Sequence, residues 1–180
     1  HEKALEHYRL VLSKPEYKNS WEYSLAYSGI ARIQLDRGFS ADAIENAEKA
    51  TIRQLLQHSS GIYNYIQNLK FQTGSLNDLI KVWTPNELLD YARGKKAYFS
   101  PGEDVLYSNT NYILLGMIIS NIEGKPFYEV FEEKIFEPLS LRSTQFAASD
   151  PVPDGIIRGY VDFYSNLNVI NATYYSGWDY

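Results

Sequence analysis

The segment His58-Ser59-Ser60-Gly61 places an imidazole directly beside two hydroxyl groups. A histidine that takes the proton of a serine hydroxyl is a common way to activate a nucleophile for acyl transfer. The two side chains must then converge on one substrate atom, and adjacent residues on a turn seldom do so. We therefore interpret this segment as a structural turn, in which the serine hydroxyl groups form hydrogen bonds with nearby backbone.

Metal and cofactor sites find no support in the sequence. The chain has no cysteine, so disulfides, thiolate metal sites and a cysteine nucleophile are excluded. Its three histidines, His1, His7 and His58, lack the close spacing of metal ligands. Gly124-Lys125 is followed by Pro126 and not by Ser or Thr, as a nucleotide-binding loop would require. We expect no metal ion and no cofactor.

A series of short motifs follows in order between residues 51 and 147. They are Thr51 to Gly61, Phe99 to Glu103, Tyr107 to Tyr112, Leu114-Leu115-Gly116, Gly124 to Phe127, Ile135 to Leu139 and Ser143 to Phe146. This succession resembles the middle region of the serine β-lactamase and penicillin-binding-protein family, in the branch of the class C β-lactamases and related esterases and peptidases. Several motifs in order are far more specific than a lone tripeptide such as Tyr-Ser-Asn.

The resemblance implies acyl transfer at an amide or ester bond. In that family a serine in an S-x-x-K motif attacks the substrate, assisted by a Y-x-N motif and by a K-T-G or H-x-G motif. Tyr107 then corresponds to the phenol that carries the proton of the nucleophile, and Asn109 to the amide that holds the acyl-side amide group of the substrate. Tyr107 and Asn109 are thus the expected catalytic residues, and Asn109 is also the expected substrate-binding residue.

The nucleophile motif of that family is missing from this sequence. None of the serines has a lysine three positions later, and neither Lys-Thr-Gly nor Lys-Ser-Gly occurs. A phenol with a pKa of about 10 acts as a base at neutral pH only where positive charge stabilises the phenolate, and family lysines supply that charge. We therefore expect a partial chain of a β-lactamase-like serine hydrolase that is inactive by itself.

For the complete protein, the resemblance implies a small-molecule or peptide substrate and a periplasmic or cell-envelope location in bacteria. The family acts on β-lactams, peptides and esters, and the sequence leaves the choice among these open.

The composition excludes two other kinds of partner. Lys+Arg total 17 against 22 Asp+Glu, a net charge of −5, so no general basic surface exists to meet nucleic-acid phosphates. The longest apolar run, Tyr112 to Ile119, has eight residues, far below the roughly 20 of a membrane helix. We expect neither nucleic-acid binding nor a membrane span.

Residues 1–50 are expected to form helices of their own, over about 1–12, over about 20–36, and from Ser40 onward. Ala43, Ala47 and Ala50 repeat the positions of Ala4, Tyr8 and Val11 at an offset of 39 residues, which indicates an internal repeat. Residues 38–50 resemble the second helix of a tetratricopeptide repeat, although the first helix of that unit fits less well. An ordinary helical hairpin is the alternative.

After a boundary expected between residues 50 and 51, the sequence predicts shorter elements. The segment Thr84-Pro85-Asn86-Glu87 combines a threonine that can cap a helix with a proline at the first helical position. Its glutamate can accept a hydrogen bond from the backbone N–H of the threonine. A helix should therefore start here and run to about Tyr91 or Ala92. A helix is expected over 111–122, stopped by Gly124, and another over 127–136, ended by Pro138. A short hairpin is expected between residues 159–164 and 169–175.

The predicted fold class is mainly α. Residues 51–180 would form the helical subdomain of a β-lactamase-like fold with a short β-hairpin, preceded by the tetratricopeptide-like segment of residues 1–50. The alternative function is a non-catalytic helical interaction module of tetratricopeptide type, which would bind a protein partner through the N-terminal helices.

Overall fold

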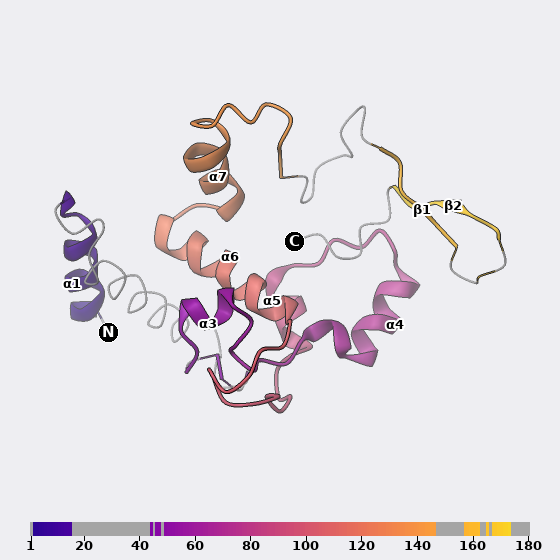
Figure 1. Cartoon of the computed structure of the whole chain (residues 1–180), viewed down its shortest axis with the longest axis horizontal. Coiled ribbons are helices and arrows are strands. Elements are labelled where there is room, and N and C mark those ends of the chain that lie inside the picture. Colours follow the sequence, from indigo (N-terminus) through magenta and orange to yellow (C-terminus); the bar gives the residue numbers. More distant parts are fainter. Residues whose placement is uncertain are drawn as a thin grey trace.

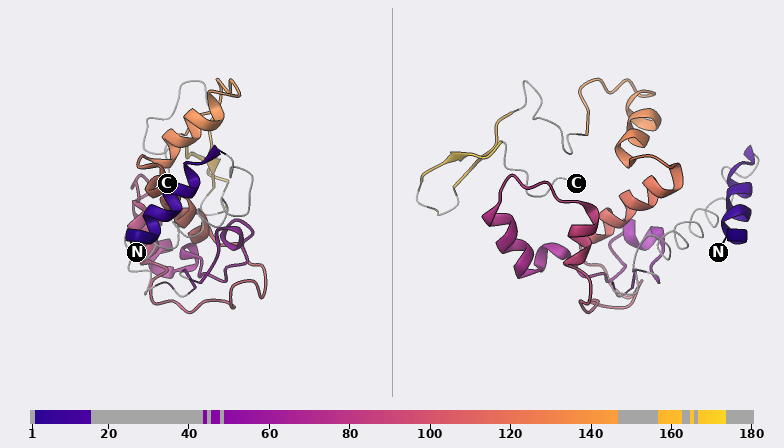
Figure 2. Two further views of the ribbon diagram at one scale, coloured as in Figure 1. Left: turned by 90° about the vertical axis from the view of Figure 1, so that its left-hand side faces the viewer. Right: turned by 180° about the vertical axis from the view of Figure 1, so that it is seen from behind.

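The computed structural model describes residues 2–15, 44, 46, 47, 49–146, 157–162, 165 and 167–173. Helix α1 (Glu2–Leu12) lies at one end of the molecule and a two-stranded sheet at the other, with a helical body between them (Figure 1). The view from behind shows the same order, and the view along the long axis shows α1 in front of the body (Figure 2).

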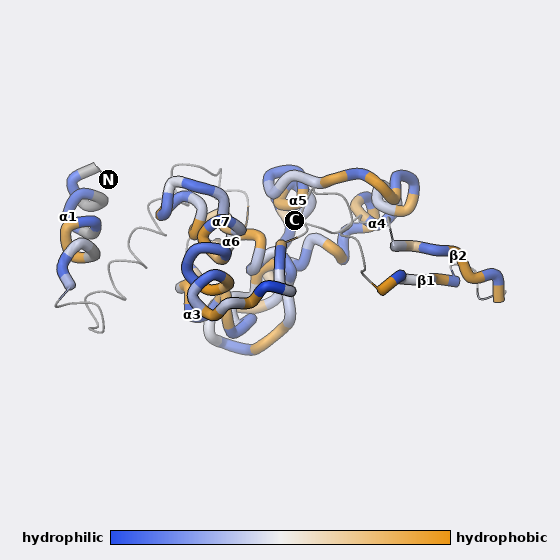
Figure 3. Tube along the Cα trace, turned by 90° about the horizontal axis from the view of Figure 1, so that it is seen from above, coloured by the Kyte–Doolittle hydropathy of each residue, from blue (hydrophilic) through white to orange (hydrophobic). Residues whose placement is uncertain are grey.

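The body is built around one long helix, α6 (Asn109–Glu123). Against it pack α3 (Ile52–Leu56), the 3₁₀ turn η3 (Tyr65–Gln67), α5 (Pro85–Asp90) and α7 (Phe127–Phe131). Helix α4 (Leu69–Asn77) follows η3, and the π-helical turn η4 (Glu132–Phe136) continues α7. Figure 3 shows hydrophobic residues in α6 and in the neighbouring α7.

The core of the body is formed by apolar side chains from all these elements except α7 and η4. Leu88, Leu89 and Leu114 are almost completely buried there. The rings of Phe71, Trp83 and Tyr91 contact one another at centroid distances of 5.3 to 5.7 Å, two of the three pairs edge to face. Edge-to-face packing suits the charge distribution of aromatic rings, so this cluster fixes the position of α4 against α5.

The helix boundaries follow from local capping, and here the sequence-based predictions are confirmed. The Thr84 hydroxyl accepts a hydrogen bond from the Glu87 N–H, and the Glu87 carboxylate accepts one from the Thr84 N–H. Gly124 ends α6 with a left-handed backbone, φ 71°, a conformation that costs glycine little. Residues 127–136 are helical as predicted, although their second half is π-helical.

The helix expected from Ser40 onward is not found in the part of it that the structure describes. Ile44, Asn46, Ala47 and Lys49 lie in a bend and turns, and Asn46 has a positive φ of 75°. The Asn46 side-chain amide donates hydrogen bonds to the carbonyl oxygens of Ser60 and Phe99, at 3.0 and 2.7 Å. These bonds to distant backbone override the local helix propensity of the segment, which is rich in alanine and glutamate.

A new helix, α3, then begins at Ile52, directly after the N-cap residue Thr51. The Thr51 side chain accepts from the Gln54 N–H, and the Gln54 side chain accepts from the Thr51 N–H. This reciprocal cap starts α3 independently of the residues before it.

The tetratricopeptide-like interpretation gains no support. Helix α1 matches the first predicted helix, but the second predicted helix, over about 20–36, lies outside the described residues, as does Ala43. Ile44 and Ala47 are buried in the same core cluster as Leu55. The boundary between residues 50 and 51 stays a prediction.

The predicted hairpin is confirmed in a shorter form. Strands β1 (Tyr160–Val161) and β2 (Ile170–Asn171) pair antiparallel, with Tyr160 opposite Asn171. The described part of the chain is therefore helix-rich with a small two-stranded sheet, in agreement with a mainly α prediction. Helix α4 was not predicted, because Gly74 and its polar residues give it little amphipathic pattern.

Candidate active site

Tyr107 and Asn109, the two residues singled out in the sequence, meet at the start of α6. The Tyr107 hydroxyl donates a hydrogen bond of 3.1 Å to Oδ1 of Asn109. Tyr107 is 61% exposed, while Asn109 is half-buried as the first residue of the helix. A phenol and a carboxamide thus stand next to each other where a ligand can reach both.

The residues on either side of Asn109 are completely buried. Ser108, Thr110 and Asn111 each have 0% exposure. The Thr110 hydroxyl donates to the carbonyl oxygen of Tyr63 at 2.7 Å and accepts from the backbone N–H of Tyr65 at 3.0 Å. These bonds tie the first turn of α6 to residues 63–65 and leave Asn109 facing outward between anchored neighbours.

His58 holds the segment that carries Tyr107. Its backbone carbonyl accepts from the Leu106 N–H at 3.0 Å, and its Nδ1 accepts from the Ser108 N–H at 3.2 Å. Nδ1 also lies 3.2 Å from Nδ2 of Asn111. A nitrogen that accepts from a backbone N–H carries no proton, so the proton of the neutral ring lies on Nε2.

The imidazole of His58 also packs against two phenol rings. Its centroid lies 4.4 Å from that of Tyr107 and 5.2 Å from that of Tyr112. His58 has a positive φ of 57°, which is uncommon outside glycine, asparagine, aspartate and histidine. This backbone conformation is part of the turn that brings the ring against Tyr107.

The Ser60 hydroxyl is used for structure, as the sequence interpretation proposed. Ser60 is fully buried; its hydroxyl donates to Oδ1 of Asn111 at 2.7 Å and accepts from the Ile62 N–H at 3.1 Å. Gly61 next to it has a φ of 71°, and a Cβ there would lie 2.0 Å from the carbonyl oxygen of Phe99. Only glycine fits this close approach of two backbones.

Asn64 fixes the orientation of the Asn109 carboxamide. Oδ1 of Asn64 accepts from the backbone N–H of Asn109 at 3.2 Å and from its Nδ2 at 3.4 Å. The Asn109 amide therefore points its nitrogen toward Asn64 and its oxygen toward Tyr107. An amide nitrogen has two N–H groups, so one donor remains for a ligand.

Electrostatically, the described surroundings of Tyr107 contain other phenols and no ion pair. Burial, and secondarily the charge of Tyr107, raise the pKa of Tyr65 to about 12. Among the described residues, none of the ion pairs or cation–π contacts involves Tyr107. No contact within the described part of the chain therefore supplies the positive charge that would stabilise a Tyr107 phenolate.

An apolar groove of about 560 Å³ borders Asn109 and Tyr65. It lies between α3, α6 and α7, and its walls are mostly aliphatic and aromatic. Its apolar lining includes Ile52, Leu56, Ile119, Ile122, Phe127 and Phe131. The polar pair at the start of α6 therefore stands at the edge of a hydrophobic depression.

Comparison with known proteins decides the family. Residues 32–167, more than half of the chain, match the Beta-lactamase family. The chain belongs to this family. The resemblance inferred from residues 51–147 is thereby confirmed, and the match extends into residues 32–50, which the sequence analysis had assigned to tetratricopeptide-like helices.

The proteins to which the chain is similar include a penicillin-binding protein and an amidohydrolase. Penicillin-binding protein 4* of Bacillus subtilis is 33% identical over 128 residues, which cover 67% of this chain and 27% of that protein. Protein flp of Staphylococcus aureus is 29% identical over 132 residues, 73% of this chain and 25% of that protein. The solved D-stereospecific amidohydrolase of a Streptomyces species superimposes with a TM-score of 0.66 at 29% identity, covering 82% of this chain and 49% of the other.

The chain thus spans about a quarter of the length of the curated relatives it matches. Its described residues contain no group of three or more side chains placed to hold a metal ion, and none of the described helices could cross a membrane. The sequence analysis predicted site roles for Tyr107 and Asn109, which stay predictions, and did not identify His58, Asn64 and Asn111 as residues that hold the start of α6. The signal for them was the density of small polar residues in 58–64 and 108–111.

Proposed function

We propose that this chain supplies the tyrosine–asparagine side of a serine acyl-transfer site, whose nucleophilic serine and lysines lie outside these 180 residues. The observation that carries the proposal is the Tyr107 hydroxyl, exposed and bonded to the Asn109 carboxamide at 3.1 Å. The family match and the hydrolytic relative support the reaction class. The substrate would be a small molecule or peptide with an amide or ester bond.

In this proposal Tyr107 moves the proton during both halves of acyl transfer. Its phenolate oxygen takes the proton of the attacking serine hydroxyl while the serine oxygen bonds to the substrate carbonyl carbon. The phenol then gives that proton to the departing amine or alcohol as the carbon–nitrogen or carbon–oxygen bond breaks. In the second half, Tyr107 takes a proton from a water molecule while the water oxygen bonds to the acyl carbon. It then gives that proton to the serine oxygen as the acyl–serine bond breaks and the acid leaves.

Asn109 would orient the substrate during this reaction. One N–H of its side-chain amide is held by Asn64, and the other can donate to the carbonyl oxygen of the acyl-side amide group. Because Asn64, His58 and Thr110 fix the start of α6, the carboxamide is held in position before the substrate arrives. Positioning of this kind lowers the entropic cost of reaching the transition state.

The test compares Tyr107→Phe with a matched control in the full chain as the source organism makes it. Tyr107→Phe removes one hydroxyl and should lower kcat for amide or ester hydrolysis about 10²- to 10⁴-fold. Tyr112 is also an exposed tyrosine whose ring lies beside His58, and its hydroxyl donates to the carbonyl oxygen of Leu56. Tyr112→Phe removes that hydroxyl and should leave kcat nearly unchanged. Equal activity of wild type and Tyr107→Phe would contradict the proton-carrying role.

A second measurement locates the nucleophile. A fluorophosphonate probe should leave the intact mass of the 180-residue chain unchanged, since no serine in it has the lysine partner that activates attack. A covalent adduct on this chain would show that the nucleophile lies within it. From the resemblance we also propose a periplasmic or cell-envelope location, which fractionation of the source cells can test.

A further inference from the structure

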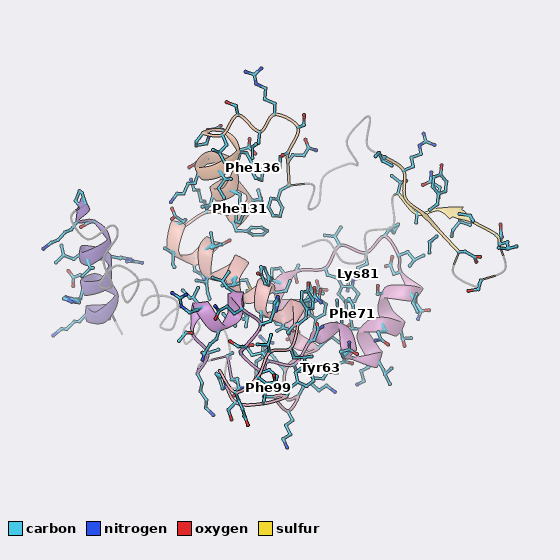
Figure 4. All side chains as sticks on the ribbon, viewed as in Figure 1. Tyr63, Phe71, Lys81, Phe99, Phe131 and Phe136 are labelled. Atoms are coloured by element: carbon cyan, nitrogen blue, oxygen red, sulfur yellow. The ribbon has the colours of Figure 1, made fainter. Side chains whose placement is uncertain are left out.

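A second hollow, of about 950 Å³, lies between η3, α4 and α5 and is lined by charged and aromatic side chains. Four of these are basic: Lys70, Lys81, Arg93 and Lys95. We call it the cationic hollow. Figure 4 shows Lys81, Phe71 and Tyr63 along this side of the body, away from Phe131 and Phe136 on the far side.

The basic residues of the cationic hollow are only half neutralised. Lys81 pairs with Glu87 at 3.1 Å, and Arg93 pairs with Asp90. Lys70 and Lys95 have no acidic partner among the described residues. Four basic and two acidic side chains, 4 − 2, leave a local charge of +2 in a chain whose net charge is −5.

Hydrogen-bond donors are also in excess in the walls of the hollow. Trp83 is 4% exposed, and its indole Nε1 has no hydrogen-bond partner among the described residues; the same holds for Nε of Arg93. A buried donor without an acceptor is unfavourable, because it loses its bond to water and gains nothing in return. These two nitrogen atoms have almost no accessible surface, so the preference of the hollow for a ligand comes from the exposed cations Lys70 and Lys95. Two cations without an acidic partner favour a ligand rich in negatively charged oxygen atoms.

The aromatic side chains give the hollow a fixed shape. Trp83 and Tyr91 belong to the aromatic cluster around Phe71, and Lys81 Nζ lies 3.7 Å from the Trp83 ring centroid. The Asn68 side-chain amide, at the start of α4, donates to the carbonyl oxygen of Tyr91 at 2.7 Å and so joins the two walls. The basic groups therefore surround a preformed concave surface.

We propose that the cationic hollow binds a small organic anion with two or more carboxylate or phosphate groups. Lys70 and Lys95 bind the anionic groups, and the body of the ligand packs on the aromatic wall. The volume lies within the range of about 300–1,000 Å³ typical of small-molecule sites, which a single inorganic ion would leave mostly empty. The proposal uses neither Tyr107 nor Asn109 and does not depend on the acyl-transfer function.

The test titrates the full 180-residue chain with tripolyphosphate and with citrate by isothermal calorimetry, in sodium chloride of matched ionic strength. Binding of either anion supports the proposal, and the tighter one identifies phosphate or carboxylate as the preferred group. Lys70→Gln and Lys95→Gln should each weaken binding about tenfold, the effect of losing one hydrogen bond between charged groups.

Lys96→Gln is the matched control, because it removes the same charge from the adjacent residue, which does not line the hollow. It should weaken binding by at most about twofold. Amide shifts of the wild-type chain on titration should be largest at Lys70, Trp83 and Lys95, a readout that does not depend on any variant folding. Absence of binding by both anions, equal losses in Lys95→Gln and Lys96→Gln, or shifts spread evenly over the chain would each overturn the proposal.

Discussion

The start of α6 and the cationic hollow use polar side chains in opposite ways. Around Tyr107, the polar residues Ser60, Ser108, Thr110 and Asn111 are completely buried, and all but the Ser108 hydroxyl have side-chain hydrogen-bond partners. In the cationic hollow, the basic residues are more exposed, and Lys70 and Lys95 have no acidic partner in the described part of the chain.

This difference predicts how substitutions in each region would affect stability and ligand binding. A buried hydrogen-bonded group stabilises the fold only while its partner is present, because the partner is otherwise left without a bond and out of reach of water. An exposed lysine contributes little to folding and keeps its charge available for a ligand. Substitutions at the start of α6 should therefore lower the free energy of unfolding, whereas substitutions in the cationic hollow should mainly weaken ligand binding.

Asn111→Ala should give the largest effect and tests the first half of this comparison. It removes the acceptor of the Ser60 hydroxyl and a donor to His58, and leaves a cavity beneath the start of α6. We expect the free energy of unfolding to fall by about 2–4 kcal/mol. Urea unfolding followed by circular dichroism measures it.

Asn121→Ala is the matched control, because it makes the same change at an exposed position of the same helix. It should alter the free energy of unfolding by about 0.5 kcal/mol or less. Equal losses in the two variants would show that the buried network around Asn111 contributes nothing specific.

Two substitutions of His58 should give a smaller and more local effect. His58→Phe keeps a ring beside Tyr107 but removes the acceptor of the Ser108 N–H, so exchange of the Ser108 amide hydrogen should become about tenfold faster. His58→Asn keeps an acceptor near the position of Nδ1 and tolerates the positive φ, so it should preserve much of that protection.

The Leu106 amide is the internal reference for this exchange experiment. It donates to the backbone carbonyl of residue 58, which both variants retain, so its exchange should change little relative to that of Ser108. If Ser108 and Leu106 lose protection equally in His58→Phe, the ring nitrogen has no separate role in holding the segment.

The smallest effect is expected at Glu87 in the cationic hollow. The hydrogen bond from the Thr84 N–H, followed by those from the Thr84 hydroxyl and Lys81, lowers the pKa of Glu87 from 4.5 to about 2. A pKa lowered by folding means that the ionised group stabilises the fold above pH 4.5, and this contribution is lost as the pH falls toward 2.

Unfolding of wild type and Glu87→Gln should therefore be compared across that pH range. The stability difference between the two should shrink as the pH falls from about 4.5 to about 2. A difference that stays constant over the range would argue that the Glu87 charge is not used in capping α5.

Features set by neighbouring residues could be predicted from the sequence, while those set by distant contacts could not. The cap at Thr84, the stop at Gly124 and the hairpin near residue 160 depend on short segments and were predicted. Local propensity predicted a helix for residues 40–50, whereas the bend and turns found at residues 44, 46, 47 and 49 are held by the bonds of Asn46 to Ser60 and Phe99.

The candidate site divides in the same way. Tyr107 and Asn109 are two residues apart and were recognised through a family motif. Their supports come from 50 and 45 residues away, in the bonds from Ser108 to His58 and from Asn109 to Asn64. The cationic hollow joins lysines of separate segments and aromatic rings, a combination that no local pattern in the sequence marks.

The mutual attachment of residues 58–64 and 106–111 also limits what protein engineering can borrow from this molecule. A designer who copied Tyr107-Ser108-Asn109 onto the first turn of a foreign scaffold would transfer the phenol and the carboxamide without the imidazole and the amide that orient them. The smallest transplantable unit is therefore a pair of loops, inserted together at matched spacing.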